Sequence, residues 1–252
     1  MRITLLLLLI SISATAQTSS LAVINDPDGF TNIRRSPGAQ APVAAIVLKD
    51  QPFYVEPSQC EWWKVNAVMW NMASLAGFEG FIHKSRVQFV RELPDSVQQG
   101  FFKRQLRAIR QQCKLADALR EKSFDRQTNA LDKTLFDSAT HTRMRAYDAT
   151  YESLVEDVRI YLCRTKDVLI LKEWLQAEID TEKSASEIPS IALGECYICQ
   201  PEWLLEQLRS FPKARRIHFY DDIAHGLTFA DDLPSAKLSK LEQQLTQERK
   251  RP

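Results

Sequence analysis

Cys196 and Cys199, in the segment ECYIC, are the residues that could support the most kinds of chemistry. A C-x-x-C pair can act as a redox couple, supply half of a metal site or close as a local disulfide. Redox chemistry of the thioredoxin type requires a helix that opens on the first cysteine. Here Gly194 precedes the pair, and Pro201 opens the next helix after it. We therefore predict that the pair lies in a loop and forms a structural disulfide.

The sequence offers few residues at the spacing that a metal site or acid–base catalysis requires. A zinc site at this pair would need two further ligands, to be drawn from Cys60, Cys113, Cys163, His218 and His225. The interval from His218 to His225 is wider than the usual histidine spacing of a zinc site. Asp221 and Asp222 lie near His225, but adjacent carboxylates on a helix point about 100° apart. The sequence therefore predicts no metal and no other cofactor.

The first sixteen residues have the pattern of a secretory signal peptide. Arg2 precedes an almost unbroken apolar run, and Ala14-Thr15-Ala16 offers a cleavage site after Ala16. We expect an exported protein, periplasmic or secreted. The five cysteines are an odd number, so in that oxidising compartment at least one is free or bonded between chains. No run of the chain is long enough to predict a membrane span.

Charge is balanced along the chain. Residues 17–92 carry seven Lys+Arg and seven Asp+Glu, and residues 93–252 carry 25 of each. Nucleic-acid binding needs a basic excess that is missing here, so we predict no nucleic-acid partner.

The common catalytic signatures are also missing from the sequence. There is no G-x-S-x-G, no H-E-x-x-H, no P-loop and no dinucleotide-binding motif. We predict a protein that is not an enzyme. The alternative is a cell-envelope enzyme or thiol-redox factor whose site combines Cys196 and Cys199 with His218 or His225.

Composition changes near Pro94. Four of the seven glycines and three of the five tryptophans precede it, whereas the stretch from Pro94 to Pro189 holds one glycine and no further proline. Glycine and proline mark turns between strands and are disfavoured inside helices. We therefore predict an α+β chain with a signal peptide at 1–16, a small β-barrel over 17–92 and an all-α domain over 93–252.

The second part has helical periodicity. Apolar residues recur at short helical steps over 97–119 and over 144–179, and further helices are expected at 219–229 and 238–245. Five or six helices are predicted in all. The C-terminal TQERKRP is expected to fray in solvent.

The segment DPDGFTNIRRSPG, residues 26–38, concentrates turn-forming residues. Gly29 and Gly38 permit positive φ, while Asp26, Asp28 and Asn32 can hydrogen-bond their own backbone. A calcium loop is the alternative, but the D-x-D-x-D-G spacing with a later Glu is missing. We predict turn chemistry here.

Four segments follow one another in a characteristic order: GFTNIRRSPG, PVAAIVLKDQPFYV, WWKV and GFEGFIHKSRV. Together they resemble the bacterial SH3-like (SH3b) domain over residues 21–90. The matching residues are Gly29, Asn32, Ile33, Arg34, Pro37, Gly38, Val43, Ile46, Leu48, Val55, Trp62, Val65, Gly80, Phe81, Ile82 and His83. Two features depart from the family: Asp50 replaces a usual glycine, and residues 67–76 lengthen a hairpin.

The resemblance implies a small SH3-like barrel and work at the cell envelope. Its partner would be a cell-wall peptide or glycan, or another envelope protein. The helical part would then serve as an interaction or scaffold element.

Strand alternation separates the two tryptophans of WWKV. Trp63 and Val65 share one face, so if Val65 enters the core, Trp62 points outward, near the long loop that carries Trp70. These outward tryptophans either cover the barrel against the helical part or line a groove for a ligand. We take Trp62, Trp70 and Tyr54 as the ligand-binding candidates.

Overall fold

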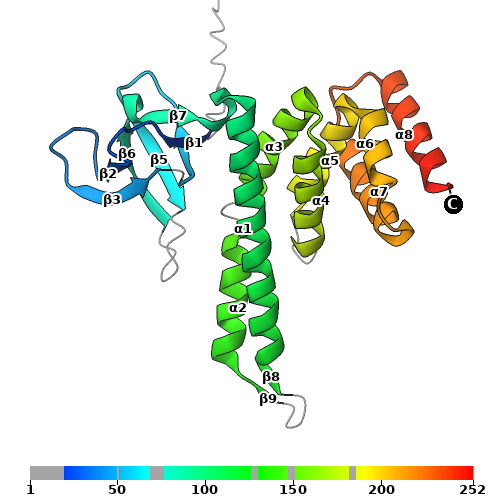
Figure 1. The fold of residues 1–252 in the computed structure, drawn as a ribbon, viewed down its shortest axis with the longest axis horizontal. Coiled ribbons are helices and arrows are strands. Elements are labelled where there is room, and N and C mark those ends of the chain that lie inside the picture. The colour runs from blue at the N-terminus through cyan, green and yellow to red at the C-terminus, as the bar shows by residue number, and fades with distance from the viewer. Residues whose placement is uncertain are drawn as a thin grey trace, which may run out of the picture.

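A computed structural model describes residues 20–49, 51–68, 77–125, 130–146, 151–181 and 186–251. The predicted signal peptide and Trp70 lie outside these residues. An antiparallel sheet is followed by a series of helices (Figure 1), so the predicted α+β class is confirmed. Within the described residues, no helix combines the length and the apolar character that crossing a membrane requires.

The sheet is formed by seven strands in the order β3-β2-β6-β5-β4-β1-β7, and every pairing is antiparallel. Their bounds are Ser20–Ile24 (β1), Phe30–Arg34 (β2), Val43–Leu48 (β3), Phe53–Glu56 (β4), Trp62–Val68 (β5), Gly77–His83 (β6) and Val87–Phe89 (β7). The predicted barrel is not closed, because β3 and β7 remain as edges. β7 has only three residues and leads directly into helical structure, so the chain leaves the sheet before it could pair with β3.

Strand alternation places the core of the sheet as predicted. Val65 is fully buried, as are Ile33 and Ile82 on other strands. Trp63 packs against this core and stacks on Phe89, with ring centroids 5.7 Å apart. Trp62, its neighbour in sequence, belongs to the opposite face.

Gly80 is required where β6 passes β2. A Cβ atom at this position would lie 2.4 Å from Cγ2 of Ile33 and 2.7 Å from the carbonyl oxygen of Arg34. Both distances are below van der Waals contact. The single backbone pairing of these strands, Arg34 with Phe81, therefore depends on a residue without a side chain.

The change from strands to helices falls at Pro94, where the composition changes. Two short 3-10 segments, η1 (Lys84–Arg86) and η2 (Val90–Glu92), flank β7. The helices are α1 (Asp95–Lys122), α2 (Lys133–Ala146), α3 (Glu152–Thr165), α4 (Val168–Thr181), α5 (Ile188–Cys199), α6 (Pro201–Leu208), α7 (Lys213–Leu227) and α8 (Ser235–Arg249). α1 and α2 form a long hairpin that projects from the rest of the molecule (Figure 1), with the short strands β8 (Phe124–Asp125) and β9 (Ala130–Leu131) at its tip.

The described residues hold more helices than the five or six predicted. One reason is that the apolar stripe over 144–179 does not belong to one helix. α3 ends at a left-handed residue, Lys166, with φ of 54°, before α4 begins. A stripe of apolar residues continues across such a break because both helices face the same core.

The prediction that the C-terminal segment TQERKRP frays is wrong. α8 continues to Arg249, and the side chain of Glu248 is only 6% exposed. Arg209 donates two hydrogen bonds to the Glu248 carboxylate, at 2.7 and 3.2 Å. A partner far away in sequence thus fixes a segment that looks solvated by its composition.

The larger hydrophobic core crosses the boundary at Pro94. Leu21 and Val23 of β1, Tyr54 of β4 and Val90 of η2 belong to the same buried cluster as the side chains of the helices. β1 and η2 contact α3 directly. The sheet and the helices therefore share a core and do not meet through a polar linker.

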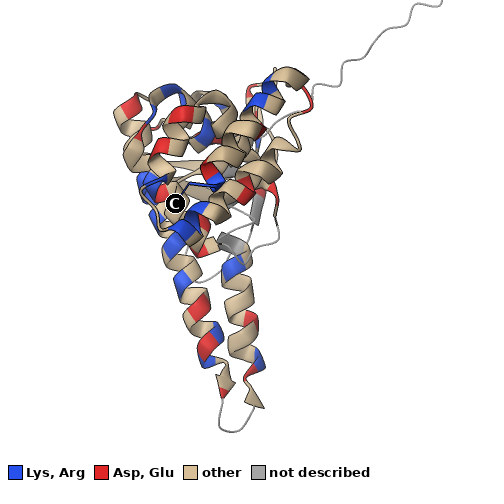
Figure 2. Cartoon of the chain, turned by 90° about the vertical axis from the view of Figure 1, so that its right-hand side faces the viewer, with Lys and Arg blue, Asp and Glu red and all other residues tan. Residues whose placement is uncertain are grey.

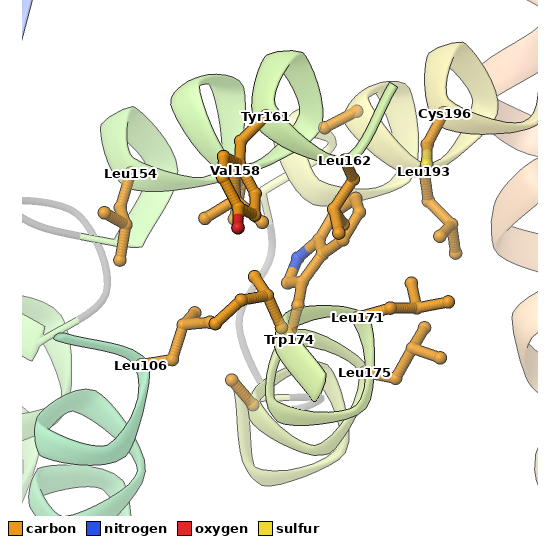
Figure 3. Close-up of a cluster of buried hydrophobic side chains, with 14 of the residues drawn as sticks. Leu106, Leu154, Val158, Tyr161, Leu162, Leu171, Trp174, Leu175, Leu193 and Cys196 are labelled. Carbon is orange, nitrogen blue, oxygen red and sulfur yellow. The ribbon is translucent and has the colours of Figure 1, made fainter. Parts of the chain in front are cut away.

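Trp174 of α4 lies near the centre of the helical part of this core. Its ring points toward Leu162 of α3 in Figure 3, with Leu106 of α1 on one side and Leu171 on the other. Trp174 is fully buried. Three helices thus meet around one large side chain.

Charged residues of both signs are interspersed on the surface. Figure 2 shows Lys and Arg interspersed with Asp and Glu along both helices of the α1–α2 hairpin. This distribution matches the balanced charge of the sequence.

α5 and α7 approach each other closely through two glycines. A Cβ atom on Gly226 would lie 2.1 Å from the carbonyl oxygen of Ser190, and one on Gly194 would lie 2.7 Å from the backbone of Gly226. No side chain fits at this contact.

Gly226→Ala should therefore lower the free energy of unfolding by about 1–3 kcal/mol, because the helices must separate. Gly100→Ala is the matched control, since its Cβ atom would only touch the end of the Arg104 side chain at 3.5 Å. The control should be neutral or stabilising by up to ~1 kcal/mol, because alanine favours helix. Urea unfolding of both variants measures the difference; equal effects would contradict the packing described.

Glu178 is a partly buried acid of α4, at the edge of the helical core. Its Oε1 atom accepts hydrogen bonds from the Tyr151 hydroxyl and, at 2.9 Å, from Trp174 Nε1. Burial raises the pKa of Glu178 from 4.5 to about 8, and the charge of Asp222 adds to this increase. The folded state therefore keeps a proton that the unfolded chain releases.

This proton makes stability depend on pH. A raised folded-state pKa contributes stability that is complete below pH 4.5 and is lost as pH rises through about 8. Glu178→Gln keeps an oxygen acceptor and removes the ionisation. The melting temperature of this variant should therefore fall less than that of the wild type between pH 6 and pH 8, the range in which wild-type Glu178 begins to lose its proton. Thermal unfolding across this range measures the difference, with exposed Glu121→Gln as control. A Gln variant with the wild-type slope would show that Glu178 does not retain the proton.

Candidate ligand pocket and cysteine cluster

A pocket of 540 Å³ lies on the sheet, beside Trp62. Its lining comes from the turn after β1, from β2, from the turn between β2 and β3, and from β5, β6 and η1. The lining residues are Asp26, Asp28, Phe30, Thr31, Asn32, Arg34, Ala39, Trp62, His83, Ser85 and Arg86. All of these residues precede Pro94. The pocket therefore belongs to the sheet and not to its interface with the helices.

The segment 26–38 forms turns on either side of β2, as predicted, and with β2 it builds one wall of the pocket. Gly29 and Gly38 have positive φ values of 79° and 136°. The backbone N–H of Gly29 donates to the carbonyl oxygen of Asp26 at 3.1 Å, and that of Asp28 donates to Oδ1 of Asp26 at 3.2 Å. Asp26 also forms an ion pair with Arg86 at 2.9 Å. Its carboxylate is thus committed to the turn and to this pair.

Trp62 and His83 form the aromatic part of the pocket. They are opposite each other on β5 and β6, and their rings meet edge to face with centroids 5.3 Å apart. His83 Nδ1 lies 2.8 Å from the Ser85 hydroxyl, and Nε2 lies 3.3 Å from Glu61. These contacts fix the imidazole beside the indole and leave the indole partly exposed.

Charge of both signs surrounds the aromatic pair. Arg34 Nη1 donates to the carbonyl oxygen of Ala41 at 2.8 Å, which holds the guanidinium at the edge of β2. Asp28 is exposed, and its carboxylate has no ion-pair partner among the described residues. The pocket can therefore offer a cation and an anion to the same ligand.

The predicted ligand-binding residue Tyr54 is not part of the lining of this pocket. Tyr54 is 9% exposed and belongs to the core shared by the sheet and the helices, so its contacts there are structural. Trp70 lies outside the described residues. The alternative role for Trp62, covering the sheet against the helices, is taken instead by Leu21, Val23, Tyr54 and Val90.

The cysteines pair differently from the prediction. Cys199 forms a disulfide with Cys163 of α3, and Cys196 is a free, buried thiol. The motif lies in the last turns of α5 and not in a loop. Gly194 lies within α5, where the absence of a side chain allows close contact with α7. The prediction of a loop was wrong because it took this glycine as a helix breaker.

Cys196 has the properties of an inert thiol in this state. Burial raises the pKa of Cys196 to about 12, with the Arg159 charge opposing the increase. Reactive cysteines have a lowered pKa, so this is the reverse of what nucleophilic chemistry needs. Cys113, also buried, has a pKa raised to about 11 for the same reason.

The two candidate histidines of the alternative site do not join the cysteines. His218 pairs with Asp222 at 3.4 Å, and His225 lies 3.9 Å from Glu187. Among the described residues, the one group of three potential metal ligands consists of Cys163, Cys196 and Cys199, whose sulfur atoms lie within 4.8 Å of one another. Cys163 was one of five candidate ligands in the sequence, and its place in a helical stripe of apolar residues did not distinguish it from the others.

Comparisons with protein-family models, with curated proteins and with solved structures found no match to this chain. The SH3b resemblance therefore depends on its motif residues alone.

The disulfide arrangement predicts a definite labelling pattern. Alkylation of the native protein should modify exposed Cys60, whereas Cys113 and Cys196 should react only after denaturation. A non-reduced digest should then contain a peptide linked through Cys163 and Cys199, with the alkyl group on Cys196 located by fragmentation. A Cys196–Cys199 linkage in that digest would contradict the pairing.

Proposed function

We propose that the protein is an exported, non-enzymatic binding protein of the bacterial cell envelope, and that its SH3b-like part binds a cell-wall peptide through the pocket beside Trp62. The observation that carries the proposal is the position of Trp62. The sequence singled out this residue as an outward aromatic, and the indole lines a pocket together with the segment that carries the SH3b motif.

The dimensions and lining of the pocket suit a small ligand. Its volume of 540 Å³ falls within the usual range of small-molecule sites. Trp62 and Phe30 supply apolar contact area, and Phe30 is 45% exposed. An exposed aromatic beside a pocket favours binding over packing, because burying it on a ligand removes apolar surface from water.

The charges favour a zwitterionic peptide over a neutral glycan. Arg34 can pair with a carboxylate and Asp28 with an amine, and peptides of the bacterial wall carry both groups. A neutral sugar would use the indole face and the hydroxyl partners but would leave these charges unpaired. Peptide is therefore the ligand class that uses the whole lining.

A pull-down of the chain from Gln17 onward with purified peptidoglycan tests the proposal. The wild type should bind, and Trp62→Ala should weaken binding by about tenfold or more, as expected for an aromatic anchor. Soluble wall peptide should compete, whereas glycan stripped of peptide should not.

Phe229→Ala is the control, because Phe229 is a solvent-exposed aromatic (43% exposed) that lies on the helical part, outside the pocket lining. It should bind as the wild type does. Circular dichroism and thermal unfolding must show that both variants are folded. Equal binding by folded wild type and Trp62→Ala, or no binding by either, would refute the pocket as a wall-peptide site.

A further inference from the structure

Three sulfur atoms converge where the ends of α3 and α5 meet. Cys163 and Cys199 are joined, and the thiol of Cys196 lies within 4.8 Å of both sulfurs. Figure 3 shows Cys196 on α5, pointing into the hydrophobic core near Leu193. Cys199 is exposed on the outer side, and Cys163 is intermediate. The cluster therefore extends from solvent to the core.

This gradient of exposure has a chemical consequence. An external thiol can reach the sulfur of Cys199, whereas Cys196 is enclosed and cannot be attacked directly. Reduction of the disulfide would leave three thiols at one point. Gln200 Nε2 donates to the carbonyl oxygen of Cys163 at 2.8 Å, and α3 packs on α5, so contacts other than the disulfide also keep the two helix ends together.

We propose that the reduced protein binds one Cu(I) ion through Cys163, Cys196 and Cys199, and that the disulfide and the metal exclude each other. Thiolates are the preferred ligands of soft cations. Cu(I) is satisfied by three thiolates, whereas structural Zn²⁺ requires four ligands. Over the described ranges, no His, Asp, Glu or further Cys joins the cluster as a fourth ligand, so the ligand set favours Cu(I).

Arg159 is the charged neighbour of Cys196 in the cluster. Its charge opposes the larger effect of burial, which raises the pKa of the Cys196 thiol. Arg159 is in turn held by Glu156 and Glu195, with Nε of Arg159 2.8 Å from Oε2 of Glu195. The apolar side of the core shields Cu(I) from water, and exposed Cys199 provides the route of entry.

The chemistry balances in two steps. A dithiol reductant gives two electrons and two protons to the Cys163–Cys199 bond and becomes a disulfide itself. Cu(I) then displaces three thiol protons and forms three Cu–S bonds, without any change in the oxidation state of copper. Binding should therefore release protons and weaken as pH falls.

Competition with a chromogenic Cu(I) chelator under anaerobic conditions tests the proposal. The full chain is used in a Cys60→Ser background, which removes the exposed thiol outside the cluster. After reduction with a dithiol and its removal, the protein should take one equivalent of Cu(I) from the chelator. The oxidised protein should take none.

Cys196→Ser is the decisive variant, and Cys113→Ser is its control, because Cys113 is also a free, buried thiol but lies outside the cluster. The first should lose the bound equivalent, and the second should retain it. If Cys196→Ser does not fold, Cys199→Ser makes the same test at an exposed position. No uptake by the reduced protein, uptake by the oxidised protein, or equal uptake by the Cys196 and Cys113 variants would overturn the proposal.

Discussion

The packing of β1 and η2 against α3 is the constraint on which the rest of the molecule depends. Leu21 and Val23 enter the helical core from β1, and Val90 enters it from η2, so the side of the sheet nearest the helices is committed to structure. In Figure 1, β2 and β3 lie on the far side of the sheet from the helices. The pocket lined by β2 residues is therefore accessible to solvent, because the helices pack on the β1 and η2 side of the sheet.

Buried acids in this protein belong to its architecture. Asp157 of α3 is 6% exposed and lies 3.5 Å from Arg91 of η2, across the same contact between the sheet and the helices. Burial raises the pKa of Asp157 to about 6, against the charge of Arg91. Glu178 shows the same effect within the helices. Neither acid lines the pocket, so perturbed ionisation here reflects packing and is no guide to a binding site.

The cysteines divide into different roles according to burial. Cys163 and Cys199 tie the ends of α3 and α5, where the chain emerges toward solvent, while Cys196 stays within the core one helical turn earlier. A C-x-x-C spacing within a helix places both sulfurs on roughly the same side. Cys196 and Cys199 thus both face α3, and Cys199 bonds to Cys163 of that helix and not to Cys196.

Local chemistry was readable from the sequence. Glycine and proline punctuation located the turns of residues 26–38 and the change to helices at Pro94, because backbone restrictions act on single residues. Alternation put Val65 inside and Trp62 outside, since a strand has a period of two.

Choices among distant partners were decided only by the tertiary structure. Tyr54, named from the sequence as a ligand-binding candidate, lies in the shared core, and Cys199 pairs with a residue 36 positions away. The sheet stayed open, and a segment expected to fray was fixed through Glu248 and Arg209. A residue's type and spacing limit what it can contact, but only the packed chain determines which candidate partner arrives within reach.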